Sequence, residues 1–173
     1  HCIAVDPWFI VSAAPMESRL IRTAREVNDG KPSHVVQRVA EHAARFRDPV
    51  IALLGLAFKA DIDDLRESPA LQIAAEVAGT VPGARLLAVE PHIEQLPAGL
   101  ASLDSVRLTT AEEALDVADI VVLLVDHQQF RSIDPATLAE KVVVDTRGLW
   151  SQAHSPAGEP RSLAVARQLV AAS

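Results

Sequence analysis

The chain has 173 residues, of which 49% are hydrophobic and 23% charged, and it carries a formal net charge of −7. This composition is typical of a soluble globular protein, and the length suits one domain with an additional segment. The acidic balance, without a basic cluster, argues against a general nucleic-acid-binding surface. No apolar run reaches the length of a membrane span. We therefore expect neither nucleic acid nor a membrane as a partner.

Cysteine occurs once, at Cys2. A single cysteine excludes an internal disulfide and a metal site built from several cysteines, so we expect a reducing, cytoplasmic setting. Taken alone, such a residue is more often a small buried hydrophobe than a nucleophile. His34, His42 and His154 lack the spacing of metal ligands, and we expect no bound metal. The chain opens on His1 rather than on a start methionine, and we expect it to be a piece of a longer protein.

Helical periodicity dominates residues 15–48. A helix is predicted over 15–27, and a second one follows after a break that Asp29 to Ser33 predict. The apolar stripe of the first helix contains Leu20, Ile21, Ala24 and Val27, and that of the second contains Val35, Val36, Val39, Ala40, Ala43 and Phe46. Two helices cannot cover both stripes, so we expect residues 1–48 to pack on a domain that is missing from this chain or on a second copy, most simply in a homodimer.

Strands alternate with helices from residue 49 onwards. Apolar runs predict strands at 50–55, 85–90, 106–108, 120–125 and 141–145, and helices are expected at 69–79, 111–118 and 160–171. Asp134 should cap a further short helix. This alternation predicts an α/β fold, a Rossmann-like parallel sheet with helices on both faces. We place the domain boundary near residue 48, between a helical segment (1–48) and this domain (49–173).

A loop of about a dozen residues joins the first predicted strand to the helix that begins at Ser68-Pro69, where such connections usually take about two to six. The loop is rich in charge: it contains Lys59, Asp61, Asp63, Asp64, Arg66 and Glu67. Open α/β sheets bind ligands at the carboxyl ends of their strands. A long charged loop at that position therefore favours a binding site over a spacer.

Polar groups also follow the other predicted strands, in Glu90-Pro91-His92, Asp126-His127-Gln128 and Asp145-Thr146-Arg147-Gly148. Lys59, Arg66 and Arg147 would converge on one edge and suit an anionic ligand such as a pyrophosphate. The alternative is that they form ion pairs within the loops. Glu90 occupies the position of the ribose-binding acid in dinucleotide folds, but the glycine fingerprint is missing, so NAD binding by this domain is weakly supported.

Several stretches resemble the middle of the nucleotide-sugar 6-dehydrogenases, the UDP-glucose/GDP-mannose dehydrogenase family. They are His1 to Phe9, Ile21 to Asp29, Gly55 to Lys59, Asp63 to Pro69, and Leu124 to His127. Residues 1–9 are most similar to the bacterial members that oxidise UDP-N-acetylmannosamine. The resemblance implies that the chain holds the catalytic-cysteine segment, the dimerisation helices and the UDP-sugar-binding domain. The NAD-binding domain of such an enzyme would precede His1.

The resemblance also implies roles for individual residues. Cys2 would be the nucleophile that captures an aldehyde as a thiohemiacetal, which is oxidised to a thioester and hydrolysed to a uronic acid. The remaining matches are Asp6 for proton movement, Phe58, Lys59 and Arg147 for the UDP-sugar, and Arg66 for the NAD cofactor. The argument from strand ends independently selects the three cations but says nothing about Cys2.

Three alternatives stay open at this point. Within the family, UDP-N-acetylglucosamine or UDP-glucose could replace UDP-N-acetylmannosamine as the substrate. In another class, the chain could be a nucleotide-sugar-binding or dimerisation module without chemistry of its own.

Overall fold

The structure, a computed structural model, describes residues 2–150, with side chains from Val5 onwards. The helices are α1 (Cys2–Ala13), α2 (Arg19–Asp29), α3 (Lys31–Ala43), α4 (Pro69–Thr80), α5 (Ala98–Ala101), α6 (Ala111–Val117) and α7 (Gln128–Arg131), with a 3₁₀ helix η1 (Pro135–Leu138). The strands are β1 (Val50–Leu54), β2 (Arg85–Val89), β3 (Val106–Leu108), β4 (Ile120–Leu123) and β5 (Val142–Asp145). The helix predicted at 160–171 lies outside the described residues. No helix within residues 2–150 combines the length and the apolar character needed to cross a bilayer.

The five strands form one parallel sheet in the order β3-β2-β1-β4-β5. β1 is central, and its Ile51 pairs with Leu86 on one side and with Ile120 on the other. The chain moves outward from β1 to β3 and then returns to place β4 on the opposite side of β1. The predicted parallel sheet is confirmed, and the reversal next to β1 is the kind of position where open α/β sheets bind ligands.

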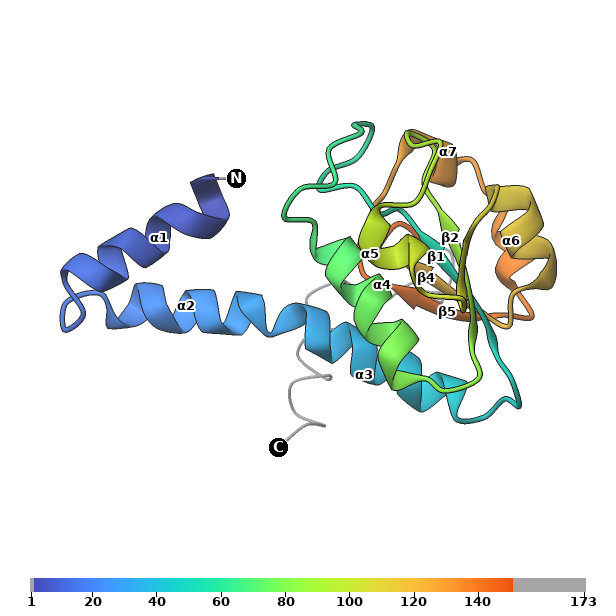
Figure 1. Cartoon of the computed structure of the whole chain (residues 1–173), viewed down its shortest axis with the longest axis horizontal. Helices are drawn as coiled ribbons and strands as arrows, with labels where there is room; N and C mark the ends of the chain where they lie inside the picture. The colour runs from blue at the N-terminus through green and yellow to red at the C-terminus, as the bar shows by residue number, and fades with distance from the viewer. Residues whose placement is uncertain (1, 151–173) are drawn as a thin grey trace, which may run out of the picture.

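Helices cover both faces of the sheet, as predicted (Figure 1). Side chains alternate along β1, so that Ile51 and Leu53 face one core while Ala52 and Leu54 face the other. The first core lies beneath α3 and α4, and the second contains residues of α6, α7 and η1. Phe130 and Trp150 are the large aromatic residues of the second core. Burial of such side chains contributes about 1.5–3 kcal/mol each to stability.

The apolar stripe of α3 is buried within the chain itself. Val36, Val39 and Ala43 belong to the same core as Ile73 and Val77 of α4. The prediction that this stripe needs a partner outside the chain is therefore wrong. The physical reason is that α3 packs on α4 and on the same face of the sheet, over β4 and β5, where its stripe is buried.

The first two helices form an arm that projects from the sheet, with α1 folded back beside α2 (Figure 1). α2 and α3 meet at Gly30, whose φ of −77° and ψ of −11° are helical, so the predicted break is reduced to one residue. The N–H of Gly30 donates to the Glu26 carbonyl at 3.0 Å, which continues the helical hydrogen bonding. In contrast to α3, α2 has no buried residue, and Leu20 and Val27 are 81% and 63% exposed.

Candidate functional site

The long loop after β1 begins at a glycine that no other residue could replace without strain. Gly55 has φ +88°, and a Cβ there would lie 2.5 Å from Val125 Cβ and 2.9 Å from Val125 backbone atoms. The ends of β1 and β4 can approach this closely only because Gly55 has no side chain. This contact brings the loop after β1 beside the segment that follows β4.

The same loop ends at Ser68, which is buried. The Ser68 hydroxyl donates to the Leu56 carbonyl at 2.7 Å and accepts from the Ala70 N–H at 3.2 Å. It therefore caps α4, as Ser68-Pro69 predicted, and ties the end of the loop to its start. A backbone hydrogen bond from Phe58 N–H to the Asp64 carbonyl, at 2.8 Å, closes the loop further.

Two cations of this loop are held in different ways. The Arg66 guanidinium donates from Nε and Nη2 to the two Asp64 oxygens, both at 2.9 Å, and these bonds lower the pKa of Asp64 to about 2. Arg66 nevertheless remains 79% exposed. Lys59 Nζ lies 5.9 Å from the centroid of the Phe58 ring. Among residues 5–150, no carboxylate lies within ion-pair distance of Lys59, so its charge is the less compensated of the two.

Glu90, at the end of β2, is a buried carboxylate with four hydrogen-bond donors. Its Oε2 accepts from Leu56 N–H at 2.7 Å, from Ala57 N–H at 3.0 Å and from His127 Nε2 at 3.0 Å. Its Oε1 accepts from His92 N–H at 3.1 Å. Burial alone would raise the pKa of Glu90, but these hydrogen bonds outweigh it and lower the pKa. Both oxygens face donors of the protein, which does not support the ribose-binding role that the position of Glu90 suggests.

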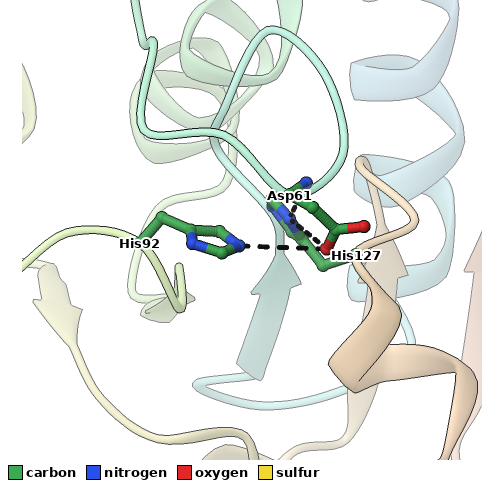
Figure 2. A group of neighbouring side chains, drawn as sticks. All are labelled: Asp61, His92 and His127. Atoms are coloured by element: carbon green, nitrogen blue, oxygen red, sulfur yellow. Dashed lines mark hydrogen bonds and ion pairs between the residues drawn. The ribbon is translucent and has the colours of Figure 1, made fainter.

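His127 lies at the end of β4 and is fully buried. Its Nδ1 accepts a hydrogen bond from the Asp61 N–H at 2.9 Å, so the proton of the neutral ring is on Nε2, which donates to Glu90. The Asp61 carboxylate in turn accepts from Gln128 N–H at 2.8 Å. Figure 2 shows a ring nitrogen of His92 and one of His127 directed toward the same Asp61 carboxylate oxygen, at 3.9 and 3.7 Å. The loop after β1 is thus fastened to the segment after β4.

Asp61, His92 and His127 also have the residue types of a metal site, and their donor atoms lie within 4.8 Å of one another. The Nδ1 lone pair of His127, however, already accepts the Asp61 N–H. His92 Nε2 is 3.9 Å from the Asp61 carboxylate, beyond hydrogen-bonding distance. We therefore interpret Asp61 and His127 as a hydrogen-bonded connection between loops, with the His92 ring packed beside it.

A second connection joins the ends of β4 and β5. Asp126 accepts from Arg147 Nε at 3.0 Å and from Arg131 Nη2 at 2.8 Å. Burial would raise the pKa of Asp126, but its own backbone N–H and the Arg147 guanidinium outweigh this and lower the pKa. Asp145 shapes the following turn by accepting from the N–H groups of Arg147, Gly148 and Trp150. Arg147 is therefore positioned on a turn that is fixed at both its backbone and its side chain.

The predicted site residues consequently fall into two groups. Phe58, Lys59, Arg66 and Arg147 lie on segments that follow β1 and β5, and the connections through Asp61 and Asp126 join both segments to the end of β4. Asp6 is exposed on α1, in the arm that projects from the sheet (Figure 1). Cys2 begins α1, but its side chain lies outside the described part of the chain.

A cavity of about 520 Å³ opens over the ends of β2 and β3. Glu90, Thr109 and Gln129 are among the residues that line it, whereas none of the predicted ligand-binding residues does. The predicted cations thus lie at an exposed edge of the sheet rather than in an enclosed pocket.

Comparison with known proteins identifies similar chains. The chain is 62% identical over 151 residues to the NDP-N-acetyl-D-galactosaminuronic acid dehydrogenase of Ralstonia solanacearum, a match covering 87% of this chain and 35% of that protein. It is 51% identical over 158 residues to the UDP-N-acetyl-D-mannosamine dehydrogenase of Yersinia pestis, covering 87% of this chain and 37% of that protein. The chain thus spans about a third of the length of these relatives.

A solved structure and a family model agree with these relatives. The structure of the UDP-N-acetyl-mannosamine dehydrogenase Cap5O from S. aureus has a TM-score of 0.67 at 32% identity, covering 86% of this chain and 34% of that chain. Residues 52–152 match the model of the UDP-glucose/GDP-mannose dehydrogenase family, UDP binding domain. The chain therefore belongs to the UDP-glucose/GDP-mannose dehydrogenase family.

Proposed function

We propose that this chain is the carboxyl-terminal, UDP-sugar-binding part of an NAD-dependent nucleotide-sugar 6-dehydrogenase. Its proposed substrate is UDP-N-acetylmannosamine, which would be oxidised to UDP-N-acetylmannosaminuronic acid. The family match over residues 52–152 supports the UDP-binding role, and the relative from Yersinia pestis supports the sugar. We propose the cytoplasm as its compartment, because a reducing environment keeps Cys2 as a thiol.

The observation that carries the proposal is the connection of three strand ends into one edge that presents cations. Lys59 and Arg147 would contact the diphosphate, where charge-assisted hydrogen bonds are strong, and Phe58 would pack beside the sugar or base. Arg147 is directed by Asp126, and Lys59 has no ion pair among the described residues. A dianionic ligand would neutralise both cations at the edge of an otherwise acidic chain.

Cys2 and Asp6 would contribute the covalent chemistry. The Cys2 thiolate would add to the sugar aldehyde, and oxidation of the resulting thiohemiacetal would leave a thioester that water hydrolyses to the acid. Asp6 would assist proton movement. NAD, bound mainly by an amino-terminal domain of the longer enzyme, would accept the hydride in each of the two oxidations. Arg66 fits a role toward NAD, because Asp64 holds only part of its guanidinium and the side chain remains largely exposed.

Binding of UDP to this chain tests the proposed division of roles. Charge-assisted hydrogen bonds contribute roughly 1.5–3 kcal/mol, so Lys59→Ala should weaken UDP binding by at least about tenfold in calorimetry. Arg147→Ala should weaken it as well, whereas Arg66→Ala should leave UDP affinity nearly unchanged and impair NAD use in the longer enzyme. Arg85→Ala, at the amino end of β2, is the control for general loss of positive charge.

Two results would contradict the division of roles. If Arg66→Ala costs as much UDP affinity as Lys59→Ala, the loop is one undivided anion-binding surface. If the unmodified chain binds no UDP at millimolar concentrations, the UDP-binding role itself fails.

Catalysis is tested separately, in the longer enzyme. The chain alone should reduce no NAD, because the proposed NAD domain is absent, and turnover by the chain alone would contradict this. Cys2→Ala should abolish acid formation, and retention of more than a trace would show that Cys2 is not the nucleophile. A longer protein that binds UDP-sugars but never reduces NAD would favour the alternative of a binding module.

A second substrate has specific support. The relative from Ralstonia solanacearum, at 62% identity, is named for an N-acetyl-D-galactosaminuronic acid, and it is more similar to this chain than the relative from Yersinia pestis. The nucleotide sugar could therefore carry N-acetylgalactosamine. An NADH assay of the longer enzyme with UDP-N-acetylmannosamine, UDP-N-acetylgalactosamine, UDP-N-acetylglucosamine and UDP-glucose decides between them.

The arm of α1 and α2 supports a homodimer as the proposed assembly. Its exposed apolar residues include Phe9, Met16, Leu20 and Val27, which are 63–81% exposed. Contact with a second copy would remove this surface from water.

A further inference from the structure

We propose that His127 is a positioning residue, which holds the loop after β1 in the conformation that presents Lys59 to the diphosphate of the ligand. This inference rests on the proposed UDP-binding function and adds to it a residue that does not itself touch the ligand. His127 is fully buried, and both of its ring nitrogens are used within the protein.

The loop is fastened on both sides of Lys59. Glu90 accepts from the N–H groups of Leu56 and Ala57, which fixes the start of the loop. His127 Nδ1 accepts from the Asp61 N–H, which fixes the loop two residues after Lys59. Because His127 Nε2 donates to Glu90, one buried network sets both positions.

The backbone of Asp61 shows that the loop is held in this conformation. Asp61 has φ +61°, a left-handed conformation that residues other than glycine adopt at a cost unless the surroundings stabilise it. Two hydrogen bonds stabilise it here, one from its N–H to His127 and one from Gln128 N–H to its carboxylate. Loss of the first should release the middle of the loop, where Lys59 lies, while the start stays bound to Glu90.

The competing explanation is that His127 only fills the core and supports Glu90. The centroids of the His127 and Phe130 rings are 5.4 Å apart, so the His127 side chain also contributes to the packing of the core. Two substitutions separate the explanations, because each retains one ring nitrogen's function. The Oδ1 atom of His127→Asn can occupy the place of Nδ1 and accept from Asp61 N–H, but this side chain cannot reach Glu90. The amide nitrogen of His127→Gln can donate to Glu90, but no acceptor remains for Asp61.

The experiment measures UDP affinity by calorimetry and amide hydrogen exchange of Asp61 by NMR in the 173-residue chain. His127→Gln should weaken UDP binding by about tenfold and speed Asp61 exchange by about tenfold, the effect of one lost hydrogen bond. His127→Asn should retain most of the UDP affinity and most of the protection of the Asp61 amide. His34→Gln is the matched control, because His34 is exposed on α3, outside the network of Glu90, His127 and Asp61, and it should change neither value.

Several outcomes would overturn the inference. They are wild-type UDP affinity in His127→Gln, a loss in His127→Asn as large as in His127→Gln, or an equal loss in His34→Gln. If the variants do not fold, the wild-type chain still decides, because an Asp61 amide that exchanges as fast as that of exposed Asp63 contradicts the hydrogen bond. If the wild-type chain binds no UDP, the proposed function fails, whereas slow Asp61 exchange would still show that the loop is held.

Discussion

Replacement of Glu90 by glutamine removes one charge from the buried network of Glu90 and His127 and changes the side-chain volume very little. Three donors converge on Oε2 of Glu90 and one on Oε1. An amide has a single oxygen, so the best orientation of Glu90→Gln places that oxygen before the three donors and its NH₂ group against His92 N–H. The variant therefore weakens three hydrogen bonds and converts the fourth into a contact between two donors.

The free energy of unfolding should fall by about 2–3 kcal/mol. Hydrogen bonds to charged groups contribute about 1.5–3 kcal/mol and neutral ones about 0.5–1.5, so three weakened bonds and one lost bond cost about 4.5–6 kcal/mol. Part of this is offset, because the neutral amide is less costly to bury than the carboxylate. For a chain of this size, the melting temperature should fall by about 4–12 °C.

Urea unfolding at pH 7 measures this change. Glu76→Gln is the matched control, because its carboxylate accepts one exposed hydrogen bond, from Gln72 Nε2 at 2.8 Å. That variant should stay within about 0.5 kcal/mol of the wild type. A Glu90→Gln variant within about 1 kcal/mol of the wild type would refute the reasoning, because the four donors would then not depend on the charge.

The same residue predicts a dependence of stability on pH. The folded-state pKa of Glu90 is lowered, so the unfolded chain binds the proton more readily. The stabilisation is fully present above the unfolded value, about 4.3, and is lost as the pH falls through the folded pKa. The stability difference between wild type and Glu90→Gln should therefore shrink in acid, and a difference that stays constant down to about pH 3 would contradict this.

The remaining predictions concern packing and assembly. Gly55→Ala should destabilise the chain by about 2–5 kcal/mol in the same assay, because its Cβ would meet Val125 at 2.5 Å and its φ is +88°. Gly79→Ala, where a Cβ meets nothing within 4 Å, should instead stabilise α4 by about 0.5–1 kcal/mol, and a loss at both positions would show that the clash is not the cause. The chain should sediment as a dimer at concentrations on the order of tens of micromolar, and Leu20→Glu should yield monomers; a wild-type monomer there would contradict the proposed assembly.

The strands could be predicted from the sequence because a sheet buried on both faces requires uninterrupted apolar runs. Their ends were less predictable. The run at 50–55 ends as a strand at Leu54, because Gly55 turns into a left-handed conformation. The run at 120–125 ends at Leu123, although Leu124 and Val125 remain buried as the chain passes Gly55.

The helical segment was predicted less well, for two reasons. α1 has apolar residues on every side and Pro7 within it, so no periodic stripe marks it as a helix. Gly30 and Pro32 predict a long break, but Gly30 adopts helical angles and Pro32 lies in the first turn of α3, where its missing N–H costs little.

The edge of the sheet that carries the site could be predicted, but the contacts within it could not. Position after a strand indicates that Glu90 and His127 lie at the carboxyl edge, yet it does not reveal that they are buried and bonded to each other. That contact joins residues 37 positions apart and depends on the register of β2 and β4 on either side of β1. The available signal was chemical: an acid and a histidine that each follow an apolar strand can satisfy each other when buried.

Trp150 gives this site an optical label of its own. The chain contains two tryptophans and no tyrosine, so its intrinsic fluorescence arises from two defined places. Trp150 is buried three residues after Arg147, and its backbone N–H is bonded to the Asp145 carboxylate that shapes the same turn. Trp8 lies on the α1 arm. With Trp8→Phe, the emission of Trp150 alone would follow any rearrangement of the turn that carries Arg147, and ligand titrations would need no attached dye.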